Sequence, residues 1–184
     1  MRAGLRCYNS RLFSGADLKA FFPGTFDPVT NGHLDIVRRA SVVFDNVVVG
    51  VYRVSDKDPL FSPRERLAMV RETVAEYSNV SAESYEGLTV EFAKSIGARV
   101  VVRGLRAISD FEYEFSLSSM NQVIESDIET ICLLTSPQFA FISSSLVREV
   151  ASLGQRVDNW VPPSVARQLR AKLEFDPSRA PSRE

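Results

Sequence analysis

The residues best suited to chemistry are concentrated in one short stretch, 23–33, which reads PGTFDPVTNGH. It holds the only histidine of the chain, His33, together with Gly24 and Gly32. Glycines let the backbone approach a ligand closely, and free amides at the start of a helix can face an anion. Thr25 offers a hydroxyl and His33 a hydrogen bond to a phosphoryl oxygen. Taken alone, such a histidine is more simply explained as a helix-capping residue.

Three further stretches carry groups that suit phosphate. RVSDKDPLF holds Lys57, and RGLRAISDFEYE holds Arg103 and Arg106 on either side of a glycine. Arginine recognises phosphate bidentately, whereas a lone loop lysine is usually a solvated charge. The stretch PQFAFISSSLVRE places three serines at a helix start, where one would suffice as a cap, and the extra hydroxyls suit an anion.

Apolar runs that alternate with helical patterns must position these groups. The runs predict strands at 18–22, 46–52, 79–85, 98–104 and 128–135, with amphipathic helices between them. Ser62, Pro63 and Glu65 predict a capped helix start, and Gly97 and Gly154 predict helix ends. Alternation of this kind predicts a single-domain α/β fold with a doubly wound parallel sheet.

Ligands of such sheets bind beyond the carboxyl ends of the strands, which is where all four stretches lie. Their convergence predicts a nucleotide site. The chain has neither a G-x-x-x-x-G-K-[ST] nor a G-x-G-x-x-G motif, so a P-loop protein and a typical dinucleotide binder are both excluded. The sequence also offers no plausible nucleophile–histidine–acid triad.

Composition limits the classes of partner. The 184 residues carry a formal net charge of −1, so the chain has no overall positive charge with which to bind nucleic acid or anionic membranes. No apolar run approaches the ~20 residues of a membrane span. Cys7 and Cys132 are far apart, and Cys132 lies in an apolar run, so we expect it to be buried. We expect a cytoplasmic protein.

Both ends of the chain differ from the middle. Residues 18–173 form the expected domain, and 1–17 and 174–184 are expected to be disordered. Arg2, Arg6 and Arg11, with no acidic residue before Asp17, also resemble an organelle transit peptide. An extension or an upstream start codon is the simpler interpretation.

The motifs, in this order, resemble a known family. PGTFDPVTNGH resembles the T/H-x-G-H region of the nucleotidyltransferase α/β phosphodiesterase superfamily, which has a Rossmann-like fold. RGLRAISDFEYE and FISSSLVRE are similar to bacterial phosphopantetheine adenylyltransferases in particular. The resemblance covers about 18–173. It departs at Val54-Ser55-Asp56-Lys57, where many members have Asn-Pro-Ser-Lys, and in the first 17 residues.

The resemblance implies transfer of an adenylyl group from ATP to 4′-phosphopantetheine, giving 3′-dephospho-CoA and pyrophosphate, with Mg²⁺ bound mainly through the ATP phosphates. It implies a homohexamer built as a dimer of trimers. Catalytic positions carried over are His33, Thr25, Lys57 and Arg106. Substrate-binding positions are Thr25, Lys57, Thr89 and Arg103. ATP positions are Thr25, Phe26, His33, Gly104, Leu105, Arg106, Glu114, Phe139, Ala140, Phe141, Ile142, Ser143, Ser144 and Ser145.

Two other functions remain open at this point. One is an adenylyl- or cytidylyltransferase that acts on another small phosphate, such as nicotinate mononucleotide. The other is a catalytically silent nucleotide-binding or regulatory protein on the same fold. The segments around Arg103 and Ser144 argue against another substrate, because relatives usually differ there. The presence of Thr25, His33, Lys57, Arg103 and Arg106 together argues against a catalytically silent protein.

Overall fold

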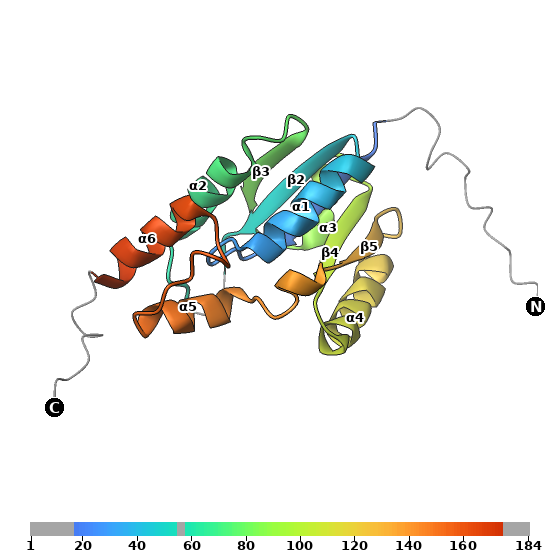
Figure 1. Cartoon of the computed structure of the whole chain (residues 1–184). Coiled ribbons are helices and arrows are strands. Elements are labelled where there is room, and N and C mark those ends of the chain that lie inside the picture. The colour runs from blue at the N-terminus through green and yellow to red at the C-terminus, as the bar shows by residue number, and fades with distance from the viewer. Residues whose placement is uncertain (1–16, 55–57, 175–184) are drawn as a thin grey trace, which may run out of the picture.

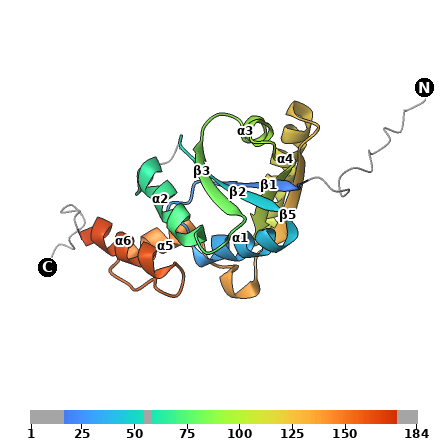
Figure 2. The same ribbon diagram turned by 90° about the horizontal axis from the view of Figure 1, so that it is seen from above.

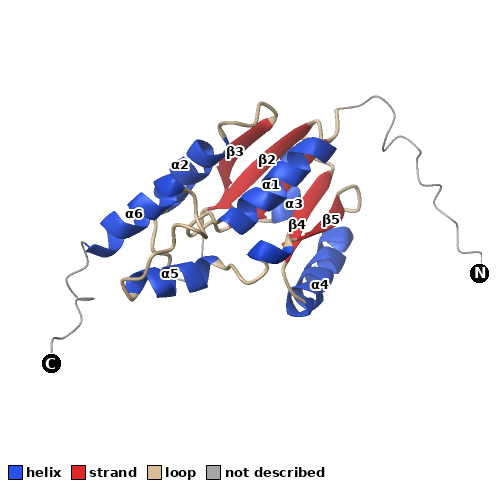
Figure 3. Ribbon diagram, viewed as in Figure 1, coloured by secondary structure: helices blue, strands red, loops and turns tan. Residues whose placement is uncertain are grey.

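The computed structural model describes residues 17–54 and 58–174. Its sheet has five parallel strands in the order β3-β2-β1-β4-β5. The strands are β1 (Lys19–Gly24), β2 (Asn46–Tyr52), β3 (Val80–Tyr85), β4 (Val100–Leu105) and β5 (Glu129–Leu134). The helices are α1 (Asn31–Val43), α2 (Pro63–Val74), α3 (Thr89–Ser95), α4 (Ile108–Ile124), the 3-10 turn η2 (Pro137–Phe139), α5 (Ser144–Ser152) and α6 (Pro163–Glu174). The predicted doubly wound α/β sheet is confirmed (Figure 1, Figure 3).

Helices cover the sheet on both sides, with α3 and α4 on one face and α1 and α2 on the other, while α6 packs against α2 and α5 (Figure 2). Alternate residues of one strand serve the two layers, as the period of a strand requires. Phe22 of β1 belongs to the larger core, and its neighbour Phe21 belongs to the smaller core beside Val90 of α3. The sheet is therefore buried on both faces in its centre, which explains why its central strands are mostly apolar.

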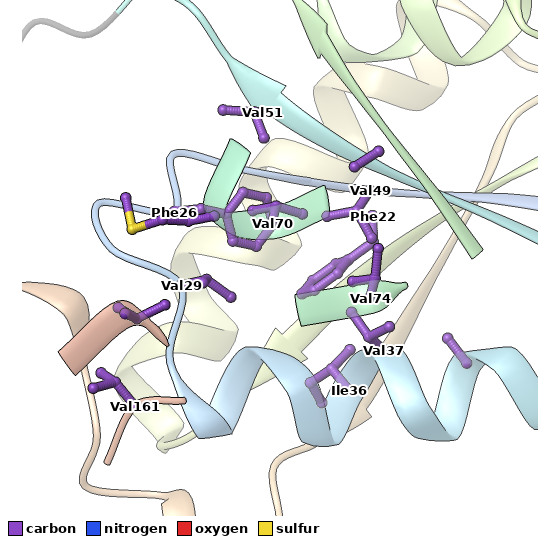
Figure 4. Close-up of a cluster of buried hydrophobic side chains, with 14 of the residues drawn as sticks. Phe22, Phe26, Val29, Ile36, Val37, Val49, Val51, Val70, Val74 and Val161 are labelled. Atoms are coloured by element: carbon purple, nitrogen blue, oxygen red, sulfur yellow. The ribbon is translucent and has the colours of Figure 1, made fainter. Parts of the chain in front are cut away.

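The larger core ties the β1–α1 turn to two helices. Figure 4 shows Phe26 and Val29 of the turn among side chains of α1 and α2, including Ile36 and Val70. All four side chains are at most 2% exposed. The stretch that carries His33 is thus anchored by its own apolar residues.

The predicted helix ends are confirmed. Ser62 and Glu65 form a reciprocal capping box at the start of α2, with bonds of 3.3 and 2.7 Å. Gly97 and Gly154 follow α3 and α5 with φ values of 71° and 78°, a region in which glycine pays no steric cost.

The expected burial of Cys132 is wrong, because this residue is exposed. Its apolar run predicts a strand covered on both faces, yet β5 is an edge strand in which Ile131 and Leu134 are also exposed.

Exposed apolar side chains gather on α4 and β5. Those on α4 include Ile108, Phe111, Phe115, Met120 and Val123, which we call the outer apolar face of α4. Val123 is 88% exposed. Isolated exposed apolar residues are ordinary, but a contiguous group marks an interaction surface.

Two expectations fall outside this description. The disorder expected at the two ends concerns residues that lie almost wholly outside the described ranges, and so does Lys57. Within the described part of the chain, no helix is both long and apolar enough to cross a membrane.

Candidate active site

A cavity of about 420 Å³ opens at the carboxyl ends of β1 and β4. The chain runs from β1 outward to β3 and then returns to β4 on the other side of β1, so this is the point at which the strand order reverses. Open α/β sheets bind ligands at such points. The cavity is lined by Phe22, Pro23, Gly24, Phe26, Thr30, Gly32, His33, Ile36, Arg103, Gly104, Arg106, Asp110, Tyr113, Glu114, Thr135, Ile142, Ser143, Ser144 and Ser145.

The structure brings most of the predicted site residues together here. The predicted residues in the wall are Phe26, His33, Arg103, Gly104, Arg106, Glu114, Ile142, Ser143, Ser144 and Ser145. Those that do not line this cavity are Thr25, Thr89, Leu105, Phe139, Ala140 and Phe141. Thr25 is exposed on the turn after β1, and Thr89 lies at the start of α3 with its hydroxyl 3.2 Å from that of Tyr85.

Helix capping fixes the orientation of His33. Thr30 is the N-cap of α1, and its hydroxyl accepts a hydrogen bond from the main-chain N–H of His33 at 3.4 Å. In return, the main-chain N–H of Thr30 donates to Nδ1 of His33 at 3.0 Å. A main-chain N–H can only donate, so Nδ1 is the acceptor and the proton of the neutral ring is on Nε2. His33 can therefore donate from Nε2 while its other nitrogen is occupied.

His33 is also held neutral. Burial and, to a smaller extent, the positive charge of Arg106 together lower the pKa of His33 from 6.5 to about 4. A neutral imidazole that donates a hydrogen bond can stabilise charge on a phosphoryl oxygen without exchanging a proton.

The Phe26 side chain packs against the His33 ring. Its ring lies edge-on to the His33 ring, with centroids 5.0 Å apart at 72°. Phe26 has a φ of 50°, in the left-handed region that non-glycine residues rarely adopt. The turn therefore places its left-handed residue at Phe26 and not at one of the glycines. Gly24 has a different role, because a Cβ there would lie 2.9 Å from the Phe26 ring.

Arg103, at the end of β4, is oriented by Glu114 of α4. Two hydrogen bonds of 2.6 and 2.7 Å join the guanidinium to the carboxylate, and a third reaches the Pro23 carbonyl at 3.2 Å. Burial alone would lower the pKa of Arg103, but the bonds to Glu114 raise this pKa above its ordinary value. The cation is permanent and its plane is fixed.

Arg106 is held in the same manner by Asp110. The Asp110 carboxylate accepts from the main-chain N–H of Arg106 at 3.0 Å and from its Nε at 3.1 Å. A further bond of 3.3 Å links Arg106 to the Ile142 carbonyl, just before α5. Burial raises the pKa of Asp110, but the hydrogen bonds from Arg106 outweigh this effect and lower it overall. Two pre-oriented arginines thus face one cavity.

The three serines have separate roles. Ser143 is the N-cap of α5 and accepts from the main-chain N–H of Leu146 at 3.1 Å. Ser144 donates its hydroxyl proton to the Pro28 carbonyl at 2.8 Å, so the start of α5 is tied to the β1–α1 turn. Ser145 is exposed and lines the cavity with them. The argument from spare hydroxyls therefore applies to Ser145, while Ser144 contributes chiefly by fixing the helix start.

Comparison with known proteins agrees with this geometry. A family model described as cytidylyltransferase-like matches residues 21–150. A phosphopantetheine adenylyltransferase of Prochlorococcus marinus is 49% identical over 159 residues, which cover 86% of this chain and 100% of the relative. Another, from Cupriavidus necator, is 51% identical over 84% of this chain and 96% of its own length. The chain belongs to the phosphopantetheine adenylyltransferase family.

A solved structure supports the fold independently. A crystal structure described as a nicotinate-nucleotide adenylyltransferase from Vibrio parahaemolyticus matches with a TM-score of 0.62 at 19% identity. The match covers 84% of this chain and 99% of the other. At that identity the likeness shows a shared fold only. The resemblance to phosphopantetheine adenylyltransferases expected from the three motifs is confirmed by the closer relatives.

The described part of the chain offers few side chains that could bind a metal ion. Among the described residues, no group of three or more His, Cys, Asp or Glu side chains is placed to hold an ion. The two carboxylates in the wall, Asp110 and Glu114, are each paired with an arginine. This donor set fits an ion that arrives on a polyphosphate and keeps its phosphate ligands.

Sequence reasoning missed several residues that build the site. Thr30 had a usable signal, because Thr30-x-x-His33 matches the spacing of a capping box with histidine in the place of glutamate. Asp110 had no such signal, because Arg106 precedes α4 and the spacing rule for ion pairs within a helix does not apply to this pair. Arg66 gave no signal, since in PRERLAM it reads as one more exposed charge.

Proposed function

We propose that this chain transfers the adenylyl group of ATP to 4′-phosphopantetheine, giving 3′-dephospho-CoA and pyrophosphate. The observation that carries the proposal is the convergence of one neutral imidazole donor, His33, with the two pre-oriented cations Arg103 and Arg106. The relatives named for this activity cover nearly the whole domain.

The chemistry requires no protein nucleophile. An oxygen of the phosphopantetheine phosphate attacks the α-phosphorus of ATP, the bond to the bridging oxygen breaks, and pyrophosphate leaves with that oxygen. Catalysis consists of placing two anions in line and stabilising charge on the equatorial oxygens. Fixed donors suit this task because they do not reorganise as the charge moves.

Each predicted residue has a part in this scheme. Nε2–H of His33 and the guanidinium of Arg106 would stabilise the transferring phosphoryl group, with Thr25 beside it. Lys57 and Arg103 would hold the phosphopantetheine phosphate, and Thr89 would contact the same substrate. ATP would lie against the remaining positions, Phe26, Gly104, Leu105, Glu114, Phe139, Ala140, Phe141, Ile142, Ser143, Ser144 and Ser145.

Mg²⁺ would enter with ATP and supply positive charge to the phosphates. The chain's own residues would orient the phosphates around it, because the wall carboxylates are already paired. The paired carboxylates, Asp110 and Glu114, would keep the two arginines in place and would not bind the ion.

We also propose that the protein acts as a homohexamer, a dimer of trimers, in the cytoplasm. The exposed outer apolar face of α4 supports assembly, because a second copy could cover it. Tyr113 and Glu114 of the same helix line the cavity, which links assembly to the site. A partner that covered this helix would stabilise one wall of the site.

Pyrophosphate release tests the proposal directly. The protein is incubated with ATP and Mg²⁺ together with phosphopantetheine, with nicotinate mononucleotide, or with neither, and products are identified by mass. Pyrophosphate and dephospho-CoA in stoichiometric amounts with phosphopantetheine alone are expected. Turnover with nicotinate mononucleotide instead, or nucleotide binding without turnover, would overturn it. The His33→Ala variant controls for contaminating activity.

A further inference from the structure

The catalytic scheme leaves one buried cation unused. Arg66, on the first turn of α2, is completely buried, with 0% of its surface exposed. It is the bulkiest of the fully buried side chains in the described part of the chain. Arginine is rarely buried to this extent unless a partner neutralises it. Its surroundings therefore need an explanation.

The guanidinium of Arg66 joins three separate segments. Nη1 donates to the Thr25 carbonyl at 2.6 Å and to the Tyr52 carbonyl at 2.7 Å. Nε donates to the Phe61 carbonyl at 3.1 Å. Thr25 follows β1, Tyr52 ends β2, and Phe61 precedes α2. One side chain thus connects the turn that carries His33 to both ends of the β2–α2 connection.

The two shortest bonds have a geometric consequence. Both carbonyl oxygens converge on one nitrogen, so the ends of the neighbouring strands β1 and β2 are drawn together at this point. Two carbonyl oxygens repel each other, and a shared cationic donor removes the repulsion. The β1–β2 register ends at Gly24 and Val51, so Arg66 holds the two chains together one residue beyond the β1–β2 ladder.

Asp27 completes the connection from the other side. Its carboxylate accepts from the main-chain N–H groups of Leu60 and Phe61 at 3.0 and 2.9 Å, and pairs with Arg148 of α5 at 2.9 Å. The main chain of Phe61 is therefore held at its N–H by Asp27 and at its C=O by Arg66. Burial lowers the pKa of Arg66, and the negative charge of Asp27 opposes this effect.

The engaged donors of Arg66, Nε and Nη1, all bind main-chain carbonyls. Two of these carbonyls lie at the exits of β1 and β2, where the segments that the proposed scheme assigns to the phosphates begin. The contacts of Arg66 therefore bear on the geometry of the site as well as on the stability of the fold.

We propose that Arg66 is a positioning residue for adenylyl transfer, which fixes the exits of β1 and β2 so that the two loops hold donor and acceptor phosphates in line. This inference rests on the proposed function. In the sequence, His33 follows β1 and Lys57 follows β2, and these are residues that the proposed scheme assigns to the phosphates. A displacement of such a group by about 1 Å can cost about 10²-fold in rate. Arg66 acts through main-chain carbonyls and touches no substrate.

Steady-state kinetics of three variants test the inference. Arg66→Met keeps an unbranched side chain of similar length without its hydrogen-bond donors. Arg66→Lys keeps the positive charge but not the planar guanidinium with its several donors. Val74→Ala is the matched control, because Val74 is buried at the opposite end of the same helix and its side chain has no hydrogen-bonding group. All are assayed below their melting temperatures, with kcat and the KM of each substrate measured separately.

For Arg66→Met we expect kcat to fall ten- to hundredfold while each KM changes less than threefold, and for Arg66→Lys an intermediate kcat. Val74→Ala should lower the melting temperature and leave kcat within twofold. If Arg66→Met does not fold, Arg66→Lys decides by the same criterion. A kcat within twofold of wild type in the folded variant, or a loss that Val74→Ala reproduces, would overturn the inference. The wild-type chain is assayed alongside. If it turns over no phosphopantetheine, the proposed reaction is wrong; if it is active and the Arg66 variants are equally active, only the role of Arg66 is wrong.

Discussion

The main-chain N–H of Thr30 donates to Nδ1 of His33 at 3.0 Å, and this one bond determines which nitrogen of the ring carries the proton. The same two residues close a capping box at the start of α1, in which histidine takes the place usually held by glutamate or glutamine. Helix capping and the proposed catalytic role therefore place the same requirement on His33. A protonated ring would present N–H to N–H at Nδ1 and would break the cap.

The first prediction concerns the titration of His33. Its pKa of about 4 lies below the unfolded value near 6.5, so the folded protein should keep the ring neutral from pH 5.5 to 8. Because the unfolded chain binds this proton as the pH falls through 6.5 and the folded chain does not, the contribution of His33 to stability is complete above pH 6.5 and declines towards pH 4. Long-range ¹H–¹⁵N spectra should show the Nε2–H tautomer.

That measurement is unusually clear here, because the chain has only one histidine and the protein can be prepared without a tag. The same sample in urea provides the unfolded reference, which should titrate near 6.5. An inflection near pH 6.5 in the folded state, or the Nδ1–H tautomer, would contradict the assignment.

The second prediction separates the cap from the catalysis. His33→Ala removes both, so kcat should fall about 10²–10³-fold, as with the loss of one donor to a transition-state oxyanion, while the KM for ATP changes little. His33→Gln can accept from Thr30 with its oxygen and present its amide N–H₂ to the cavity. We expect Gln to recover helix stability and part of kcat, measured by thermal denaturation and steady-state kinetics. Near-normal turnover in His33→Ala would remove His33 from the mechanism.

The sequence predicts the framework of this protein well, because local signals specify it. The strands are apolar runs of five to eight residues, and the cap at Ser62 and Glu65 is a two-residue pattern that needs no tertiary information. Arg103, Arg106 and His33 could be placed together because parallel strands expose their carboxyl ends at one edge.

The remaining features depend on contacts that no local pattern encodes. Arg66 is a helix residue among other charges, and only packing shows that it is buried against three carbonyls. The left-handed conformation of Phe26 has no signal in the sequence, because nothing in the residue type favours a positive φ. Cys132 was misplaced because burial of an edge strand depends on what covers it.

The third prediction tests whether the bidentate geometry of the Arg103 guanidinium contributes to substrate binding in addition to its charge. Arg103→Lys keeps the cation but cannot make the two bonds to Glu114 together with the bond to Pro23. Since charge-assisted bonds contribute about 1.5–3 kcal/mol, the KM for phosphopantetheine should rise about tenfold or more, with a smaller effect on ATP. Arg64→Lys, an exposed change on α2, is the control and should be neutral. An unchanged KM for phosphopantetheine would mean that Arg103 acts only as a diffuse charge.

The fourth prediction concerns how the two substrates are divided between loops. A lysine is a compact charge on a flexible stem and can follow the attacking phosphate, so Lys57→Ala should raise the KM for phosphopantetheine ten- to hundredfold and that for ATP far less. Ser144→Ala should show the opposite bias, because loss of its bond to Pro28 releases the start of α5 from the β1–α1 turn. Weaker ATP binding with unchanged phosphopantetheine binding in Lys57→Ala would show that the altered Val54–Asp56 segment has reassigned this loop.

The fifth prediction concerns assembly through the outer apolar face of α4. Val123 is apolar and 88% exposed, so burial against another copy would remove it from water, and a carboxylate at this position would have to be buried without a partner. Val123→Glu should therefore convert the proposed hexamer into smaller species, measured by light scattering after size exclusion. Ala68→Glu makes the same charge change at an exposed position of α2 and should leave the wild-type mass unchanged. Because Tyr113 and Glu114 of α4 line the cavity, the dissociated variant should also lose activity that is recovered at high protein concentration. A Val123→Glu protein that keeps the wild-type mass would place the interface elsewhere.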